Sequence, residues 1–173
     1  MPGNAPPQVW RGAAGLPTFP HLPSPDAMPT IQDPAARAEL VARLRRVTPS
    51  TAPAWGTLTA PRMVCHLTDQ LRVALGDAPC RDVSTLPLRT VVRFLVLRTG
   101  FQAPPGKVKT VREMLESQPT TWDADMATCE ALLERLATAT TVAPHPAFGV
   151  FSPADWGIMA WKHFDHHLRQ FQA

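Results

Sequence analysis

The sequence lacks the features that mark several common protein classes. It has no apolar run approaching the length of a membrane span, and its start is not a basic stretch followed by an apolar one. We therefore expect no membrane partner and no secretory signal. Its three cysteines, Cys65, Cys80 and Cys129, are not clustered, which argues against a disulfide scaffold and favours a reducing cytoplasm.

Motifs for phosphate binding and nucleophilic catalysis are also missing. There is no Gly-rich phosphate loop, no GxSxG and no CxxC pair. The formal net charge of +3 is too small to indicate a nucleic-acid partner by itself. One stretch carries only positive charges: Arg89, Arg93, Arg98, Lys107, Lys109 and Arg112. Because this stretch has no interleaved aromatic residues, a solvated basic face is favoured over a nucleic-acid interface.

Proline is abundant at the start of the chain, with eight residues in 1–30. That density is incompatible with a regular helix or strand. We therefore expect a disordered tail over 1–30 and one domain over 31–173. Met28 stands just before the first structured element and is an alternative start codon, so residues 1–27 are expected to be dispensable.

The remaining sequence has the periodicity of amphipathic helices, which predicts an all-α fold. Helices are expected from Asp33, from Thr59 to Gly76, from Leu88 to near Gly100, from Thr120 or Thr121, and from Ser152 to Phe171, with a short extra helix near 110–117. Arg43, Arg45 and Arg46 are expected on a solvated face of the first helix. In the third, Leu88, Val91, Val92 and Leu95 have helical spacing, although the run VVRFLVL is also compatible with a strand. In the fourth, a 4-3-4-3 spacing typical of a bundle seam joins Trp122, Met126, Cys129, Leu133 and Leu136. Four long amphipathic helices joined by loops predict an antiparallel four-helix bundle.

The last helix carries the strongest functional signal. Ser152 and Asp155 have the spacing of a capping box at its start. His163 and His167, one turn apart, share the apolar face with Trp156. Lys162, Asp165 and Arg169 are expected to point towards water. An i, i+4 histidine pair is a common way for a helix to bind a transition metal, although hydrogen bonds to water or carboxylates would also satisfy the two rings.

A third histidine favours metal binding over ordinary hydrogen bonding as the role of this pair. His66 lies on the inward stripe of the helix that starts near Thr59, so it can meet His163 and His167 inside a bundle. Three protein ligands leave positions open for water or substrate, as in catalytic sites. Imidazoles suit zinc, nickel, iron or copper as the divalent metal. Asp69 and Gln70, one turn from His66, are candidates for the second shell of ligands.

The segments MVCHLTDQLRVALG, HPAFG and WKHFDHHLRQF resemble the DinB-like superfamily, specifically a family of unknown function within it, over about residues 31–173. The resemblance implies a four-helix bundle whose metal is bound by one histidine on the second helix and an HxxxH pair on the last. The matching positions are His66, His163 and His167. The adjacent His166 is expected at the edge of the site, and His145, in the HPAFG loop, is a candidate for the pocket lining or a loop cap.

Some members of this superfamily resemble transferases that join a low-molecular-weight thiol to an electrophile, and a bound metal would favour the thiolate nucleophile. The first hypothesis is therefore a metal-dependent transferase or hydrolase for a small molecule. The second is a non-catalytic, stress-related bundle that binds a metal or ligand. The third, a nucleic-acid binder, is the least favoured. The sequence does not decide whether the protein forms a homodimer.

Overall fold

The computed structural model describes residues 28–101 and 111–173. These residues form helices, turns and loops and contain no β-strand. The elements are α1 (Pro34–Leu44), α2 (Ala60–Leu75), η1 (Leu88–Val92, π-helical), α3 (Arg93–Arg98), η2 (Arg112–Leu115, a 3₁₀ helix), α4 (Trp122–Ala137) and α5 (Pro153–Gln170). The prediction of an all-α protein is confirmed, and the strand alternative for VVRFLVL is wrong. No helix within the described residues is long and apolar enough to cross a membrane.

The helices begin and end where their capping residues predict. Asp33 accepts a hydrogen bond from the Ala35 amide at 2.8 Å. Gly76 ends α2 in the left-handed conformation, with φ of 78°, which glycine adopts at little cost. At the start of α5, both hydrogen bonds of the capping box between Ser152 and Asp155 are present. Residue 110, where the short extra helix is predicted to start, and the predicted tail up to residue 27 lie outside the described residues.

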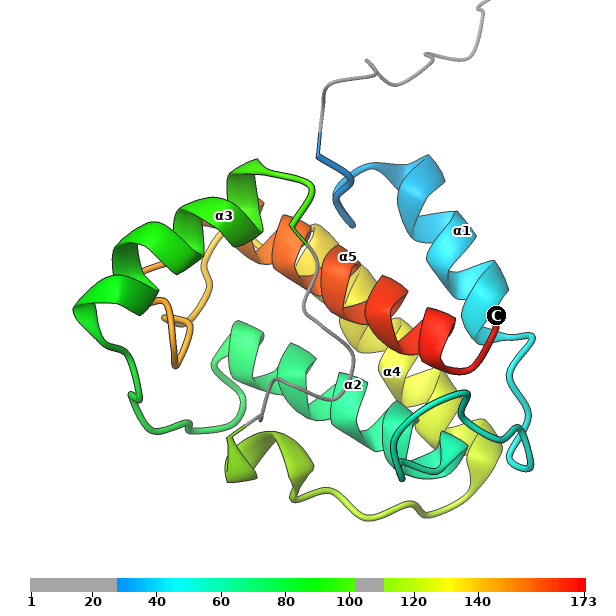
Figure 1. The fold of residues 1–173 in the computed structure, drawn as a ribbon. Coiled ribbons are helices and arrows are strands. Elements are labelled where there is room, and N and C mark those ends of the chain that lie inside the picture. The colour runs from blue at the N-terminus through cyan, green and yellow to red at the C-terminus, as the bar shows by residue number, and fades with distance from the viewer. Residues whose placement is uncertain (1–27, 102–110) are drawn as a thin grey trace, which may run out of the picture.

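Helix α5 lies in the middle of the molecule and contacts α1, α2, α3 and α4 (Figure 1). The most extensive packing joins α2 to α4. Fully buried side chains from four helices form one core: Leu40, Leu44, Met63, Leu67, Leu71, Leu133, Leu136, Trp156, Phe164 and Leu168. The seam predicted for α4 is buried at Met126, Cys129, Leu133 and Leu136, and Trp122 at its start is partly buried against the core.

The segment before α1 packs on α5 at a glycine. The amide of Ile31 donates to the carbonyl oxygen of Gly157 at 3.2 Å. A Cβ atom at Gly157 would lie 2.5 Å from the hydroxyl oxygen of Thr30, so only glycine permits this approach. Met28 also packs against the core.

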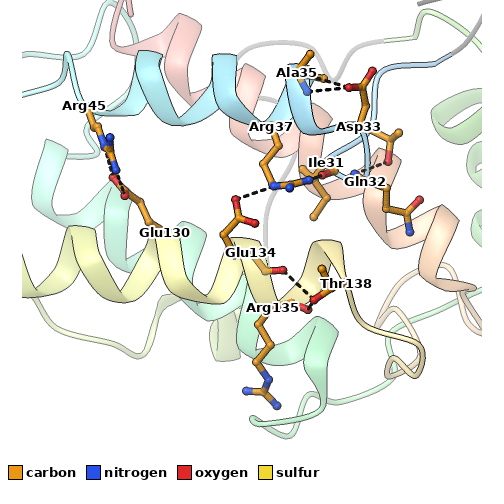
Figure 2. Close-up of polar contacts among 12 residues, drawn as sticks. Ile31, Gln32, Asp33, Ala35, Arg37, Arg45, Glu130, Glu134, Arg135 and Thr138 are labelled. Atoms are coloured by element: carbon orange, nitrogen blue, oxygen red, sulfur yellow. Dashed lines mark hydrogen bonds and ion pairs between the residues drawn. The ribbon is translucent and has the colours of Figure 1, made fainter. Parts of the chain in front are cut away.

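Ion pairs join α1 to α4 (Figure 2). Arg37 pairs with Glu134 at 2.7 Å, and Arg45 pairs with Glu130 at 2.6 Å. Arg37 also donates to the carbonyl oxygen of Ile31, which fixes the segment entering α1. These contacts set the position of α1 beside α4.

Three polar residues expected to face water do not. Asp165 is buried and pairs with Arg43 at 2.9 Å and with Arg169 at 3.0 Å. Arg43, expected on a solvated face, also donates to the carbonyl oxygen of Ala173. Lys162 donates to the carbonyl oxygens of Val96, Thr99 and Phe101 and thereby holds the end of α3 against α5. The expectation failed because polar partners on other elements replace water around these charges.

The residues whose spacing predicts the third helix do not form its buried side. Leu97 is 2% exposed and anchors α3, whereas Val91 and Leu95 are 62% and 37% exposed. A π-helical turn over Leu88–Val92 changes the rotation per residue, so a regular helical period does not predict the buried side.

Candidate metal centre

The structure brings His66, His163 and His167 together between α2 and α5. One ligand nitrogen from each ring can be chosen so that all lie within 4.8 Å of one another. The ring centroids are 4.7 to 4.9 Å apart and the rings meet edge to face. This is the only group of three or more potential metal ligands found among residues 28–101 and 111–173.

His66 is oriented by a backbone carbonyl. Its Nδ1 lies 2.7 Å from the carbonyl oxygen of Met114. Because a carbonyl only accepts, Nδ1 carries the proton and Nε2 keeps a free lone pair. Met114 was not among the residues predicted from the sequence, because a backbone carbonyl in a distant 3₁₀ helix leaves no side-chain signal.

Asp69 acts on the segment that contains Met114 rather than on the imidazole of His66. Its carboxylate accepts hydrogen bonds from the amide and the hydroxyl of Ser117. Arg62 donates to the carbonyl oxygens of Leu115 and Ser117 and holds the same segment from the side. These contacts fix η2 on α2, so that the Met114 carbonyl faces His66.

His167 is oriented in the same way by a side chain that the sequence reasoning missed. Its Nδ1 lies 2.8 Å from Oε1 of Gln170, and Nε2 of Gln170 donates to the carbonyl oxygen of Trp55 at 2.7 Å. Since the Trp55 carbonyl only accepts, the amide group of Gln170 must present its oxygen to His167. His167 therefore carries its proton on Nδ1, and its Nε2 is free to bind a metal. The i, i+3 spacing of these two residues was the available signal.

His163 completes the group but has a different hydrogen-bond pattern. Its Nε2 lies 2.9 Å from Nε2 of His66. Its Nδ1 is buried and has no hydrogen-bond partner within the described residues. Because Nε2 of His66 is an acceptor, the proton in this contact belongs to Nε2 of His163.

The electrostatic environment favours neutral imidazoles. Burial lowers the pKa of His66, His163 and His167, that of His167 to about 3. Neutral imidazole is the form that binds metals. The donor set therefore fits a divalent transition metal in charge, and His66 and His167 also fit in orientation, because each has its Nε2 unprotonated.

The other predicted residues have separate places. His166 lies outside the group of three, half-buried, with its ring edge-on to His167 and 6.1 Å from Trp55. His145 caps its own loop, because its Nδ1 accepts from the amides of Ala147 and Phe148.

Gln70 is buried on α2, and its Oε1 has no partner in the part of the chain that the structure describes. It lies one helical turn beyond His66 and shares its face of the helix. Gln70 therefore brings an amide oxygen without a partner to the inward side of α2, one turn from the candidate metal ligand His66.

Two hollows lie away from the histidines. One, of about 270 Å³, is lined by α2, α4 and the loop between them, with Cys65, Arg72 and Asp125 in its walls. The other, of about 160 Å³, lies on α3. None of the three histidines lines either hollow.

A family model described as "Protein of unknown function (DUF1569)" matches residues 27–173. The chain belongs to this family. Neither a curated protein nor a solved structure matches the chain significantly. The family match covers all three clustered histidines.

Proposed function

We propose that this DUF1569 protein is a metal-dependent enzyme for a small molecule, with one divalent transition metal bound by His66, His163 and His167. The observation that supports the proposal is the convergence of three neutral imidazoles, two of which have Nδ1 hydrogen-bonded and Nε2 unprotonated. We further propose that the chain is a DinB-like four-helix bundle, in which α1, α2, α4 and α5 are the four helices.

The reaction we favour is a thiol-dependent transfer or a hydrolysis. A metal at this site would supply a Lewis acid that lowers the pKa of a bound thiol or water. The three imidazoles would bind it and leave coordination positions open, since they are only three ligands. Met114 and Gln170 would keep two of the rings in the productive orientation.

A non-catalytic metal-binding protein is the second candidate, and burial of the site favours it. His66 and His167 are 5% and 9% exposed, although His163 is only partly buried. A buried site binds a metal firmly but admits substrate poorly.

An activity assay separates the two candidates. Protein loaded with zinc, nickel or iron is incubated with a low-molecular-weight thiol and a panel of electrophiles and esters, and product is measured. The enzyme proposal predicts turnover that requires metal and is lost in His163→Ala. Absence of turnover with every fully loaded metal form would contradict the enzyme and favour the binding protein.

A further inference from the structure

The three histidines differ in how their Nδ1 atoms are satisfied. Met114 accepts from His66 and Gln170 accepts from His167, but Nδ1 of His163 has no partner among the described residues. Histidines that bind metals almost always donate their second ring nitrogen to an acceptor. The site is therefore incomplete at His163.

An unused acceptor lies on the facing helix. Oε1 of Gln70 is buried and also lacks a partner in the described part of the chain. Burying an amide oxygen without a hydrogen-bond donor costs free energy, so an unpartnered Oε1 in a folded protein needs an explanation. Gln70 and His163 thus present two unsatisfied polar groups on two helices in contact.

The packing of α2 on α5 brings these groups to the same level. The two helices run in opposite directions (Figure 1). At one level, His66 touches His163. At another, Ala143 links them, because its amide donates to Ala74 and its carbonyl accepts from Trp156. Gln70 lies midway between positions 66 and 74, so it faces the α5 turns between Trp156 and His163.

Two other buried atoms without partners are poorer candidates. Trp161 is two residues from His163, a rotation of roughly 200° around the helix, so its indole faces away from the histidine ring. The carboxylate of Glu113 is turned towards Arg81, which lies 3.4 Å away. Neither group replaces Gln70 as the partner of His163.

Metal binding changes the hydrogen-bond partner that Nδ1 of His163 requires. Its Nε2 now carries the proton and donates to His66, so its Nδ1 is an acceptor. Binding a metal through Nε2 requires the proton to be on Nδ1 instead, with no change in net charge. In that state Oε1 of Gln70 can accept from Nδ1–H, so that two buried atoms without partners satisfy each other.

We propose that Gln70 is the positioning residue of His163, its Oε1 accepting from Nδ1–H when the metal is bound. The proton leaves Nε2 and is taken up at Nδ1 by exchange through water, which gives both unpartnered atoms a hydrogen bond. This inference rests on the proposed metal site.

The test combines zinc affinity with ¹⁵N–¹H NMR of histidine side chains. Wild-type His163 is expected as the Nε2–H tautomer without zinc and as the Nδ1–H tautomer with zinc. Gln70→Leu should bind zinc about 10- to 100-fold more weakly. Gln70→Glu keeps the acceptor oxygen and should bind zinc at least as tightly as wild type. The exposed Gln118→Leu is the matched control and should change nothing.

The possible results separate the role of Gln70 from the existence of the metal site. Equal zinc affinity in wild type and Gln70→Leu, or a Gln70→Glu variant as weak as Gln70→Leu, would overturn the role of Gln70 while leaving the metal site intact. If Gln70→Leu does not fold, as judged by its thermal transition without zinc, the Gln70→Glu result and the tautomer decide. Wild-type protein that binds no zinc contradicts both this inference and the proposed function.

Discussion

At the scale of single residues, the site depends on side chains that hold the imidazoles rather than on the imidazoles alone. Gln170 satisfies three groups at once: Nδ1 of His167, the carbonyl oxygen of Trp55 and, through its own carbonyl, the amide of Ala54. Replacing the amide side chain leaves two buried polar groups without partners.

Gln170→Leu should therefore weaken zinc binding by about 10- to 100-fold. It should also lower the free energy of unfolding of the metal-free protein by about 1–3 kcal/mol. Chelator competition and urea denaturation measure the two effects, with Gln118→Leu as the exposed control. A Gln170→Leu variant with wild-type zinc affinity would show that His167 needs no outer hydrogen bond.

His145 gives a prediction about pH that does not involve the metal. Burial lowers its pKa to about 3, whereas the unfolded chain titrates near 6.5. Between these values the unfolded state binds a proton that the folded state does not, so stability falls as the pH falls through this window. The loss amounts to about 1.4 kcal/mol per pH unit for one proton.

His145→Asn removes this proton but keeps an oxygen that can accept from the amide of Ala147. Its free energy of unfolding, measured by urea denaturation between pH 6 and pH 4, should fall less steeply than that of wild type by about 1.4 kcal/mol per pH unit. The substitution also changes the free energy of unfolding at every pH, because the packing of the imidazole ring is lost. Only the difference in pH dependence tests the lowered pKa of His145. Parallel pH profiles would contradict the assignment.

At the scale of elements, a single buried leucine, Leu97, anchors the apolar side of α3. Leu97→Ala should lower the free energy of unfolding by about 2–5 kcal/mol, the usual range for a buried leucine. Leu95→Ala, two residues away and partly exposed, should change it by less than about 0.5 kcal/mol. Equal effects in urea denaturation would mean that the buried side of α3 is misassigned.

Local signals in the sequence predicted most of the elements. The capping box of Ser152 with Asp155, the left-handed cap at Gly76 and the seam of α4 all depend on residues a few positions apart, so a linear pattern contains them. The same holds for the inward faces of α2 and α5, which brought three histidines into one group.

Interactions between distant segments were not predictable in this way. The burial of Asp165 depends on Arg43, 122 residues away in the chain. Orientation of His66 depends on the carbonyl oxygen of Met114, which any residue type could supply. Such contacts are set by the packing of helices and loops, and helical periodicity alone does not specify them.

At the scale of the whole molecule, the candidate metal centre joins parts of the chain that are far apart in sequence. Helix α2 supplies one of its histidines, α5 supplies two, and the segments around Met114 and Trp55 orient two of the three rings. Since α5 also contacts α1, α3 and α4, its position is fixed from several sides. The packing of the helices thus determines where the three imidazoles lie.

Metal content of the purified protein tests the central claim most directly. Elemental analysis of untagged protein should give one divalent transition metal ion per chain for wild type. His66→Ala and His167→Ala should lose it, whereas His166→Ala should keep it, because the His166 ring lies outside the group of three. Unchanged metal content in both His66→Ala and His167→Ala, or loss of metal in His166→Ala alone, would contradict the account.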